Sequence, residues 1–216
     1  ATIEKVAYKP LRGAPKLTAL ITSIGVAFFL QNAVMLIYGA KEQSLPEIIP
    51  TVQWHLGKVS FSLIQLIIFI TAIGLMFFLT WFVKNTRLGK AMRASAENSE
   101  AAQLVGINVN RIIRVTFVMG SALAAVGGSL FGIYYGSINY HDGYLAGLKA
   151  FTAAVFGGIG SIPGAMIGGV LLGVFESLGA AYISSQWKDV FAFVLLGIVL
   201  ILKPSGLLGE NLPDKV

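Results

Sequence analysis

Long runs of apolar residues, separated by short charged connections, dominate this sequence. Residues 17–38 and 61–83 carry no charged side chain, and residues 113–136 carry only Arg114, next to their start. A helix needs about 20 apolar residues to cross a hydrocarbon core that is about 30 Å thick. The pattern therefore predicts three long membrane-spanning helices over these three ranges.

The last third of the chain has a less regular pattern. Residues 150–175 carry no charge, but the glycine-rich run from Gly157 to Gly164 (GGIGSIPG) interrupts them. Glycine and proline weaken a helix, and proline also lacks a backbone donor. Pro204 and Gly206 provide a stop before the C-terminus. We expect three further segments, a short helix at 150–156, a fifth segment at about 165–183 and a short sixth at 190–202. The chain is thus predicted to be an all-α polytopic membrane bundle with a broken segment near Gly157–Gly164.

Lysine and arginine are concentrated in alternate connections. Four of them precede the first long segment and six lie between residues 84 and 114, whereas residues 139–148 contain none. Because positive charge is retained on the cytoplasmic side, the N-terminus and the 84–114 connection are predicted to be cytoplasmic. Six crossings then return the C-terminal tail, with Lys203 and Lys215, to that side. The cations that set this orientation are Lys5, Lys9, Arg12, Lys16, Lys84, Arg87, Lys90, Arg93, Arg111 and Arg114.

The composition excludes several classes of protein. Only 12% of the 216 residues are charged and 56% are hydrophobic, whereas a soluble domain carries about 25% charged residues. The net charge of +6 comes from the connections and not from a clustered basic face, which argues against nucleic-acid binding. The sequence has no cysteine, so disulfides and thiolate metal sites are excluded. His141 and Asp142 lack further metal ligands, and Ser161 is predicted on the opposite side of the membrane, so we predict neither a metal site nor a catalytic triad.

One segment of the cytoplasmic connection has the signals of a short helix. Asn98 or Ser99 can cap its start, and Glu100 falls in the first turn, where a negative charge suits the helix dipole. Small, helix-forming residues follow at Ala101–Ala102, and Gly106 suits the left-handed position that ends a helix. We predict a helix of two turns that lies off the membrane, with small side chains around which a groove of another protein could close. A plain solvated loop is the alternative.

Polar residues inside the predicted spans are candidates for a translocation path. Glu176 is the carboxylate of the fifth segment, and a charge at the bilayer centre costs about 3 kcal/mol. It should therefore face protein or water, or lie close to a surface. Glu176 either lines the path or makes a structural contact near the outer boundary. For Gln31 and Asn32 in the first segment, we prefer hydrogen bonds between helices to contact with substrate.

The glycine-rich break allows two interpretations. Non-helical backbone at membrane depth is tolerated only where it is buried in protein or lines a wet cavity. The break is therefore either a tight turn between two helices at the cytoplasmic surface or an element of a gate or translocation path.

Pairs of glycines four residues apart let helix backbones approach closely. Such pairs serve either ordinary packing or a rocking movement of the helices. The candidate gate residues are Gly157, Gly158, Gly160, Ser161, Pro163 and Gly164, and the spaced pairs are Gly128/Gly132, Gly132/Gly136, Gly164/Gly168 and Gly169/Gly173.

Several motifs of this chain resemble those of one family of membrane proteins. The most specific is RASAEN (93–98), followed in the cytoplasmic connection by EAA (100–102) and GINV (106–109). These motifs are similar to the EAA loop of bacterial ABC importer permeases and, in this longer form, to the high-affinity branched-chain amino acid permease family. Further matching segments are YKPLRG (8–13), IG (24–25), LQN (30–32), GGIGSIPGA (157–165), SSQWKD (184–189) and KPSGLLG (203–209).

The resemblance implies a mechanism of coupling to ATP hydrolysis. Residues 1–216 would form one permease domain, and family members begin with further hydrophobic segments, so the chain is expected to be an N-terminally incomplete permease. Residues 84–112 would form a cytoplasmic coupling loop whose short helix docks into a groove of a separate ATPase. The residues of this coupling helix would be Arg93, Glu100, Ala101, Ala102 and Gly106.

The resemblance also implies a set of partners. The sequence lacks the G-x-x-x-x-G-K-[ST] loop, so ATP and Mg would be bound by the partner ATPase subunits and this chain would bind no cofactor. A second homologous permease subunit and an extracytoplasmic amino-acid-binding protein would complete the importer. The assembly would lie in the cell inner (cytoplasmic) membrane.

Two other functions fit part of the pattern. A channel or an ion-coupled transporter of small polar solutes would use the broken segment as a filter and would not need the short helix. A structural membrane subunit would have no path of its own. As the substrate of an importer, a branched-chain or related amino acid suits apolar walls with few charges, and urea or short amides remain alternatives.

Overall fold

The computed structural model describes most of the chain, which divides into two compact units. One unit comprises residues 1–71 and 81–144, and the other comprises residues 72–80 and 145–216. The described residues are 2–11, 15–46, 49, 53–56, 59–158, 160–203 and 206–209. Predictions that involve Arg12, Pro204 or Lys215 fall outside this part of the chain.

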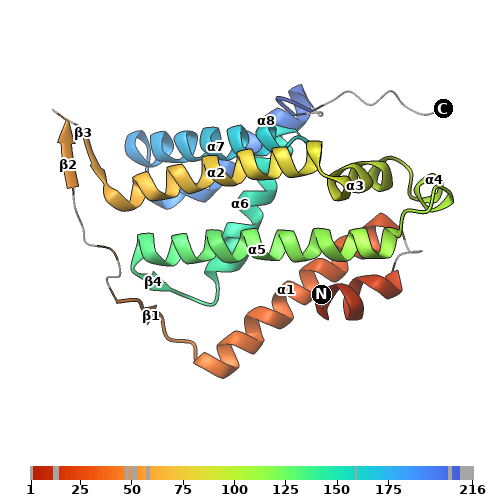
Figure 1. The fold of residues 1–216 in the computed structure, drawn as a ribbon. Coiled ribbons are helices and arrows are strands. Elements are labelled where there is room, and N and C mark those ends of the chain that lie inside the picture. Colours follow the sequence, from red (N-terminus) through yellow and green to blue (C-terminus); the bar gives the residue numbers. More distant parts are fainter. Residues whose placement is uncertain are drawn as a thin grey trace. The chain divides into compact units, whose positions relative to one another are not determined.

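The first unit is built on long apolar helices, and residues 72–80 of one of them, α2, belong to the second unit. α1 spans Lys16–Tyr38, α2 spans Leu63–Asn85 and α5 spans Val109–Tyr135 (Figure 1). They confirm the three predicted long segments, with ends that differ by a few residues. α2 begins at a capping box on Ser62, and α5 ends at Gly136, whose φ of 70° is left-handed.

The N-terminal segment contacts the start of α5. Its elements are the π-helical turn η1 (Glu4–Tyr8) and the 3₁₀ turn η2 (Lys9–Leu11). Glu4 is buried and its Oε2 lies 3.9 Å from Nε of Arg114, while the ring of Tyr8 lies 4.9 Å from the ring of Phe117. These contacts place the N-terminal segment and the start of α5 at one end of the unit, as the distribution of cations predicts.

Two small antiparallel ladders, which the sequence analysis did not predict, lie in the connections. They are β1 (Gln43–Ser44) paired with β4 (Ser137–Ile138), and β2 (Gln53–Leu56) paired with β3 (Val59–Ser62). A Cβ at Gly132 would lie 2.9 Å from a δ-methyl of Leu45 and of Ile138, so this glycine is a packing position. Gly128, its predicted companion, has no neighbour within 4 Å of such a Cβ among the described residues.

The second unit contains three consecutive helices and a 3₁₀ turn. They are α6 (Asp142–Gly157, with residues 145–157 in this unit), α7 (Ile162–Tyr182), η3 (Ser185–Trp187) and α8 (Lys188–Leu202).

Two predicted boundaries of these helices are wrong. α6 begins at Asp142 and not at residue 150, because this carboxylate suits the first turn of a helix. Pro163 and Gly164 belong to the first turn of α7 and not to the break. Proline is tolerated there because the backbone N–H groups in the first turn of a helix have no partner within the helix, so the missing N–H of proline costs no hydrogen bond.

Most of the apolar helical surface is exposed in the isolated chain. Within the described residues, the four helices α1, α2, α5 and α7 are long and apolar enough to cross a membrane. Leu36 on α1 is 81% exposed, whereas Ala153 and Leu172 form a small core in the second unit. Such surfaces suit contact with lipid or with other membrane helices, and the predicted all-α membrane bundle is confirmed. The count of six crossings stays a prediction, because α6 and α8 have only 16 and 15 residues.

Candidate coupling and translocation sites

A sharp bend joins α2 to the coupling loop. α3 (Arg87–Glu97) begins directly after α2, and its N-cap is Thr86, whose Oγ1 accepts a hydrogen bond from the backbone N of Gly89 at 3.0 Å. A Cβ at Gly89 would collide with carbonyl groups in the last turns of α2. Arg93 donates from Nη2 to the carbonyl of Lys84 at 3.3 Å. α3 is therefore tied to the end of α2 by backbone contact and by the Arg93 side chain.

α4 is the short helix that the sequence predicts within the coupling loop. It spans Ser99–Leu104, and Asn98 caps it by accepting hydrogen bonds from two N–H groups of its first turn, both at 3.0 Å. Glu100 lies in that turn, and Gly106, with a φ of 84°, follows the helix end. The predicted cap and stop are confirmed, and the structure selects Asn98 over Ser99. With six residues, the helix is shorter than the predicted two turns.

The two alanines of α4 have different surroundings. Ala101 is exposed, but Ala102 is only 3% exposed because α4 turns this face towards α3 and α5. Ala102 therefore packs within the loop, and its role in docking to a partner stays a prediction. Leu104 and Val105 are instead 89% and 76% exposed. Sequence reasoning missed this pair, although two consecutive apolar residues just before a helix-ending glycine were a visible signal.

A groove lies where α4 meets the start of α5. Its volume is about 560 Å³, and it is lined by Ser99 and Gln103 of α4, by residues 106–110 and by Ile113. Asn108 caps α5, because its Oδ1 accepts a hydrogen bond from the first turn at 3.1 Å. α4 contacts both α3 and α5. A displacement of α4 would therefore reach α5 directly and α2 through α3.

The break between α6 and α7 is a tight turn, and its described residues 157, 158, 160 and 161 are called the glycine turn. Gly158 and Gly160 have left-handed φ angles of 111° and 94°, and Oγ of Ser161 caps α7 by accepting from the backbone N of Gly164 at 3.1 Å. A Cβ at Gly157 would collide with the carbonyl of Gly164, so the two helices meet backbone to backbone. This geometry agrees with the interpretation as a turn between two helices. A role of these residues in a gate stays a prediction.

The C-terminal segment closes the glycine turn. The backbone N–H groups of Leu207 and Leu208 donate to the last two carbonyls of α6, each at 2.9 Å. Gly206 has a φ of 76° and lies so close to Gly158 that a Cβ would be 2.5 Å from its backbone. These bonds satisfy carbonyls that the end of a helix leaves without partners. The glycine turn and this segment therefore occupy the same end of the second unit, which is the predicted cytoplasmic end.

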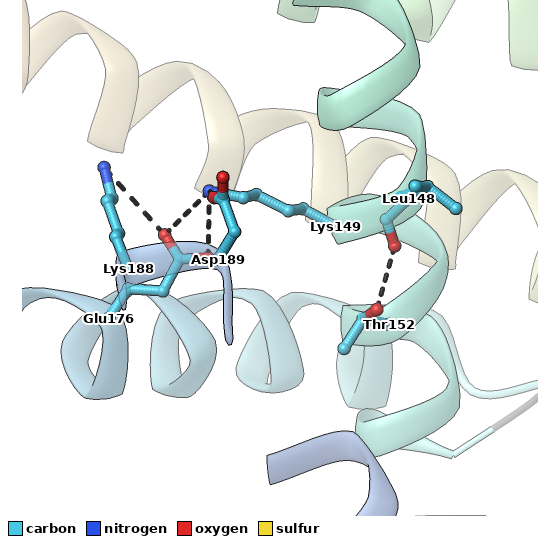
Figure 2. Close-up of polar contacts among 6 residues, drawn as sticks. All are labelled: Leu148, Lys149, Thr152, Glu176, Lys188 and Asp189. Atoms are coloured by element: carbon cyan, nitrogen blue, oxygen red, sulfur yellow. Dashed lines mark hydrogen bonds and ion pairs between the residues drawn. The ribbon is translucent and has the colours of Figure 1, made fainter. Parts of the chain in front are cut away.

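Glu176 belongs to a charge cluster, which consists of Lys149, Glu176, Lys188 and Asp189. Figure 2 shows the ammonium group of Lys149 between the two carboxylates. Its Nζ lies 2.7 Å from Oδ1 of Asp189 and 3.1 Å from Oε1 of Glu176, while Nζ of Lys188 lies 4.0 Å from Oε2 of Glu176. Glu176 is 7% exposed, and cations from two other helices compensate its burial. Sequence reasoning missed these partners, although Lys149 and Glu176 delimit the charge-free run of residues 150–175.

Gln31 and Asn32 make different contacts. Nε2 of Gln31 lies 2.6 Å from Nδ1 of His141, a turn residue just before α6, so this side chain joins α1 to the connection before α6 and not to another helix. Nδ2 of Asn32 donates to the carbonyl of Phe28 at 2.8 Å. This bond lies within α1, so the prediction of a bond between helices does not describe Asn32. Participation of either residue in a translocation path stays a prediction.

Known proteins are similar to this chain along its whole length. The family model described as the permease component of branched-chain amino acid transport systems matches residues 7–200. The chain is 51% identical over 219 residues to the high-affinity branched-chain amino acid transport system permease protein BraD of Pseudomonas aeruginosa, a match that covers 100% of this chain and 71% of the relative. The chain belongs to this permease family. The permease proteins LivH of Salmonella typhimurium and Escherichia coli K12 are 49% and 48% identical to it over 220 residues, with the same coverage. No solved structure matches the permease.

The family assignment confirms the resemblance that the sequence motifs indicate. The permease is an integral membrane protein, as its apolar helices require. Its relatives are named as transport permeases, which fits a protein that moves a solute and does not transform it. The roles of individual residues in the coupling loop, the glycine turn and the charge cluster are not assigned by these similarities.

Proposed function

We propose that the permease is the membrane-spanning subunit of an ATP-binding-cassette importer for branched-chain or related amino acids, located in the cytoplasmic (inner) membrane. The support is its family, whose members BraD and LivH are named as high-affinity branched-chain amino acid transport permeases. The long apolar helices, with few buried charges, suit a substrate that has an apolar side chain.

The energy source in this proposal is a separate ATPase, which binds ATP and Mg. An extracytoplasmic amino-acid-binding protein delivers the substrate, and a second homologous permease subunit completes the path. The observation that carries the proposal is the exposed pair Leu104 and Val105 at the end of α4. Exposed apolar residues that adjoin a groove fit a protein partner better than they fit water.

Movement would pass from the ATPase into the membrane through the coupling loop. α4 is held at its start by the Asn98 cap and at its end by Gly106, and it packs on α3 and α5 through Ala102. A helix fixed in this way moves with its neighbours and does not bend separately. Closure of two ATPase subunits on ATP would therefore shift the cytoplasmic ends of α2 and α5 together.

The replacement Leu104→Glu tests the proposal, with Leu104→Met as the matched control. A buried apolar contact at a protein interface contributes about 2 kcal/mol, so the glutamate variant should bind the ATPase about 30-fold more weakly. The measurements are co-purification of the ATPase and ATP-dependent uptake of labelled L-leucine into proteoliposomes that contain the assembled importer. The glutamate variant should lose both, and the methionine variant should keep both. Full uptake without ATP would refute the proposal and support the channel or ion-coupled alternative.

A further inference from the structure

The charge cluster lies at the end of the second unit opposite the glycine turn. Glu176 precedes the end of α7 at Tyr182 by six residues, which corresponds to about 9 Å of helix. Lys188 and Asp189 open α8. The distribution of lysine and arginine predicts that this end faces the outside, which is where an imported substrate arrives.

The contacts within the charge cluster are unequal. Lys149 is held firmly, since its Nζ lies 2.7 Å from Asp189 and 3.1 Å and 3.2 Å from the two oxygens of Glu176. Lys188 reaches only 4.0 Å from Glu176, and its side chain is 41% exposed. The cluster therefore has a firm half around Lys149 and a loose half between Lys188 and Glu176.

One carboxylate oxygen of Glu176 has a partner that it shares with other groups. Its Oε1 is buried, lies 3.1 Å from Nζ of Lys149 and makes no further hydrogen bond within the described part of the chain. The same ammonium group also contacts Oε2 of Glu176 and Oδ1 of Asp189. Because a carboxylate oxygen can accept more than one hydrogen bond, a second donor can bind Oε1 beside Lys149.

We propose that the charge cluster binds the α-ammonium and α-carboxylate groups of a free amino acid. The α-ammonium group donates to Glu176 and the α-carboxylate group pairs with Lys188, so that the zwitterion enters the loose 4.0 Å contact. Lys149 and Asp189 stay paired and position Glu176. The inference rests on the proposed function and names the part of the permease that recognises the backbone of its substrate.

The charge balance of the cluster favours this ligand class. Two carboxylates face two ammonium groups, so a zwitterion can enter without adding net charge to a buried site. A zwitterion that entered an apolar path without such partners would meet the penalty for charge in the membrane. α8 also begins without a side-chain cap, and the positive end of its dipole adds to the attraction that Lys188 exerts on a carboxylate.

The charge cluster offers a different group to each charge of the ligand. Lys188 can pair with the carboxylate and Glu176 with the ammonium group, and the two side chains lie 4.0 Å apart. The site thus distinguishes an amino acid from an amine or an acid that shares its side chain.

The test is equilibrium binding to the assembled importer in lipid nanodiscs, without the binding protein. The probes are L-leucine, 3-methylbutylamine, which lacks the carboxylate, and 4-methylpentanoate, which lacks the ammonium group. Lys188→Gln should weaken L-leucine and 4-methylpentanoate by about 10- to 100-fold and leave the amine unchanged. Glu176→Gln should weaken L-leucine and the amine and leave the acid unchanged. The control Lys41→Gln, at an exposed lysine of the first unit, should bind all three probes as the wild type does.

The outcomes separate this inference from the proposed function. If Lys188→Gln binds L-leucine and 4-methylpentanoate as the wild type does, or weakens all three probes equally, the inference is wrong. The Lys188→Gln variant tests the inference even if Glu176→Gln fails to fold. The side chain of Lys188 is exposed and only loosely paired, so its replacement should leave the fold intact. ATP-dependent leucine uptake by the wild type, together with unaltered binding by the Lys188 variant, would overturn the inference alone. Selective binding without any ATP-dependent uptake would overturn the proposed function alone.

Discussion

Replacement of Gly168 by alanine should destabilise the crossing of α6 and α7. A Cβ at Gly168 would collide with the carbonyl of Ala153 and lie 2.8 Å from the backbone N of Gly157. These atoms are backbone atoms of α6, so no side chain can rotate away from the added methyl group. The next residue, Gly169, offers a matched control, because a Cβ there would lie at an ordinary 3.8 Å from the Cβ of Ala153.

The expected loss of stability follows from the difference between the surroundings of Gly168 and Gly169. Both replacements gain the same helix propensity, about 1 kcal/mol relative to glycine, so this contribution cancels when the variants are compared. Contacts at Gly168 are about 1 Å shorter than the optimal separation of carbon atoms, which forces α7 away from α6. Overpacking of this kind costs about 1–3 kcal/mol. Gly168→Ala should therefore be less stable than Gly169→Ala by about 1–3 kcal/mol.

The assay is unfolding of the purified permease in mixed micelles by increasing amounts of a denaturing detergent, followed by tryptophan fluorescence. Gly173→Ala serves as a second control, because a Cβ at Gly173 has no neighbour within 4 Å among the described residues. Gly168→Ala should unfold at a lower detergent fraction than both controls. Equal unfolding curves for the three variants would refute the close crossing of the two backbones.

Two further predictions concern the coupling loop and the C-terminal segment. Asn98→Ala removes the cap of α4 and should cost about 1 kcal/mol, seen as roughly fivefold faster amide exchange in α4; Ser99→Ala should not change the exchange rate, and equal effects of the two would contradict the capping geometry. Gly206→Ala adds a Cβ against the backbone of the glycine turn and should release the C-terminal segment, so that the two amides after it exchange faster. Gly160→Ala imposes only left-handed strain of about 1–2 kcal/mol, since a Cβ there meets no described atom, and it should leave those two amides protected.

Features that depend on neighbours in the sequence could be predicted. The three long helices follow from uninterrupted apolar runs, because a membrane helix satisfies its own backbone hydrogen bonds. The cap at Asn98 and the stop at Gly106 also follow from local chemistry, since a side-chain oxygen and a left-handed φ are needed at those positions. The boundary of α6 was less predictable, because glycine and polar residues near Asp142 are compatible with both a helix and a loop.

Features that depend on residues far apart in the sequence could not be predicted. Ala102 resembles Ala101 in the sequence, and only the packing of α3 and α5 decides that Ala102 faces inward. Lys149 precedes Glu176 by 27 residues, and the pair forms because α6 and α7 cross. The pairing of β1 with β4 likewise joins segments on either side of two long helices. A pattern of single residues holds no information about which of these partners meet.

The two ends of the second unit are closed by different kinds of contact. At the glycine turn, backbone atoms of α6, α7 and the C-terminal segment touch, so the helices can separate there only if hydrogen bonds and packing are lost together. At the charge cluster, the helices are joined by the side chains of Lys149, Glu176 and Asp189, which can change ion-pair partners while the backbone stays in place. A charged ligand can compete for those side chains, whereas the contacts between glycines offer it no group to replace. The kind of contact, and not the number of polar residues, therefore makes the charge cluster the end of this unit at which a zwitterion would be recognised.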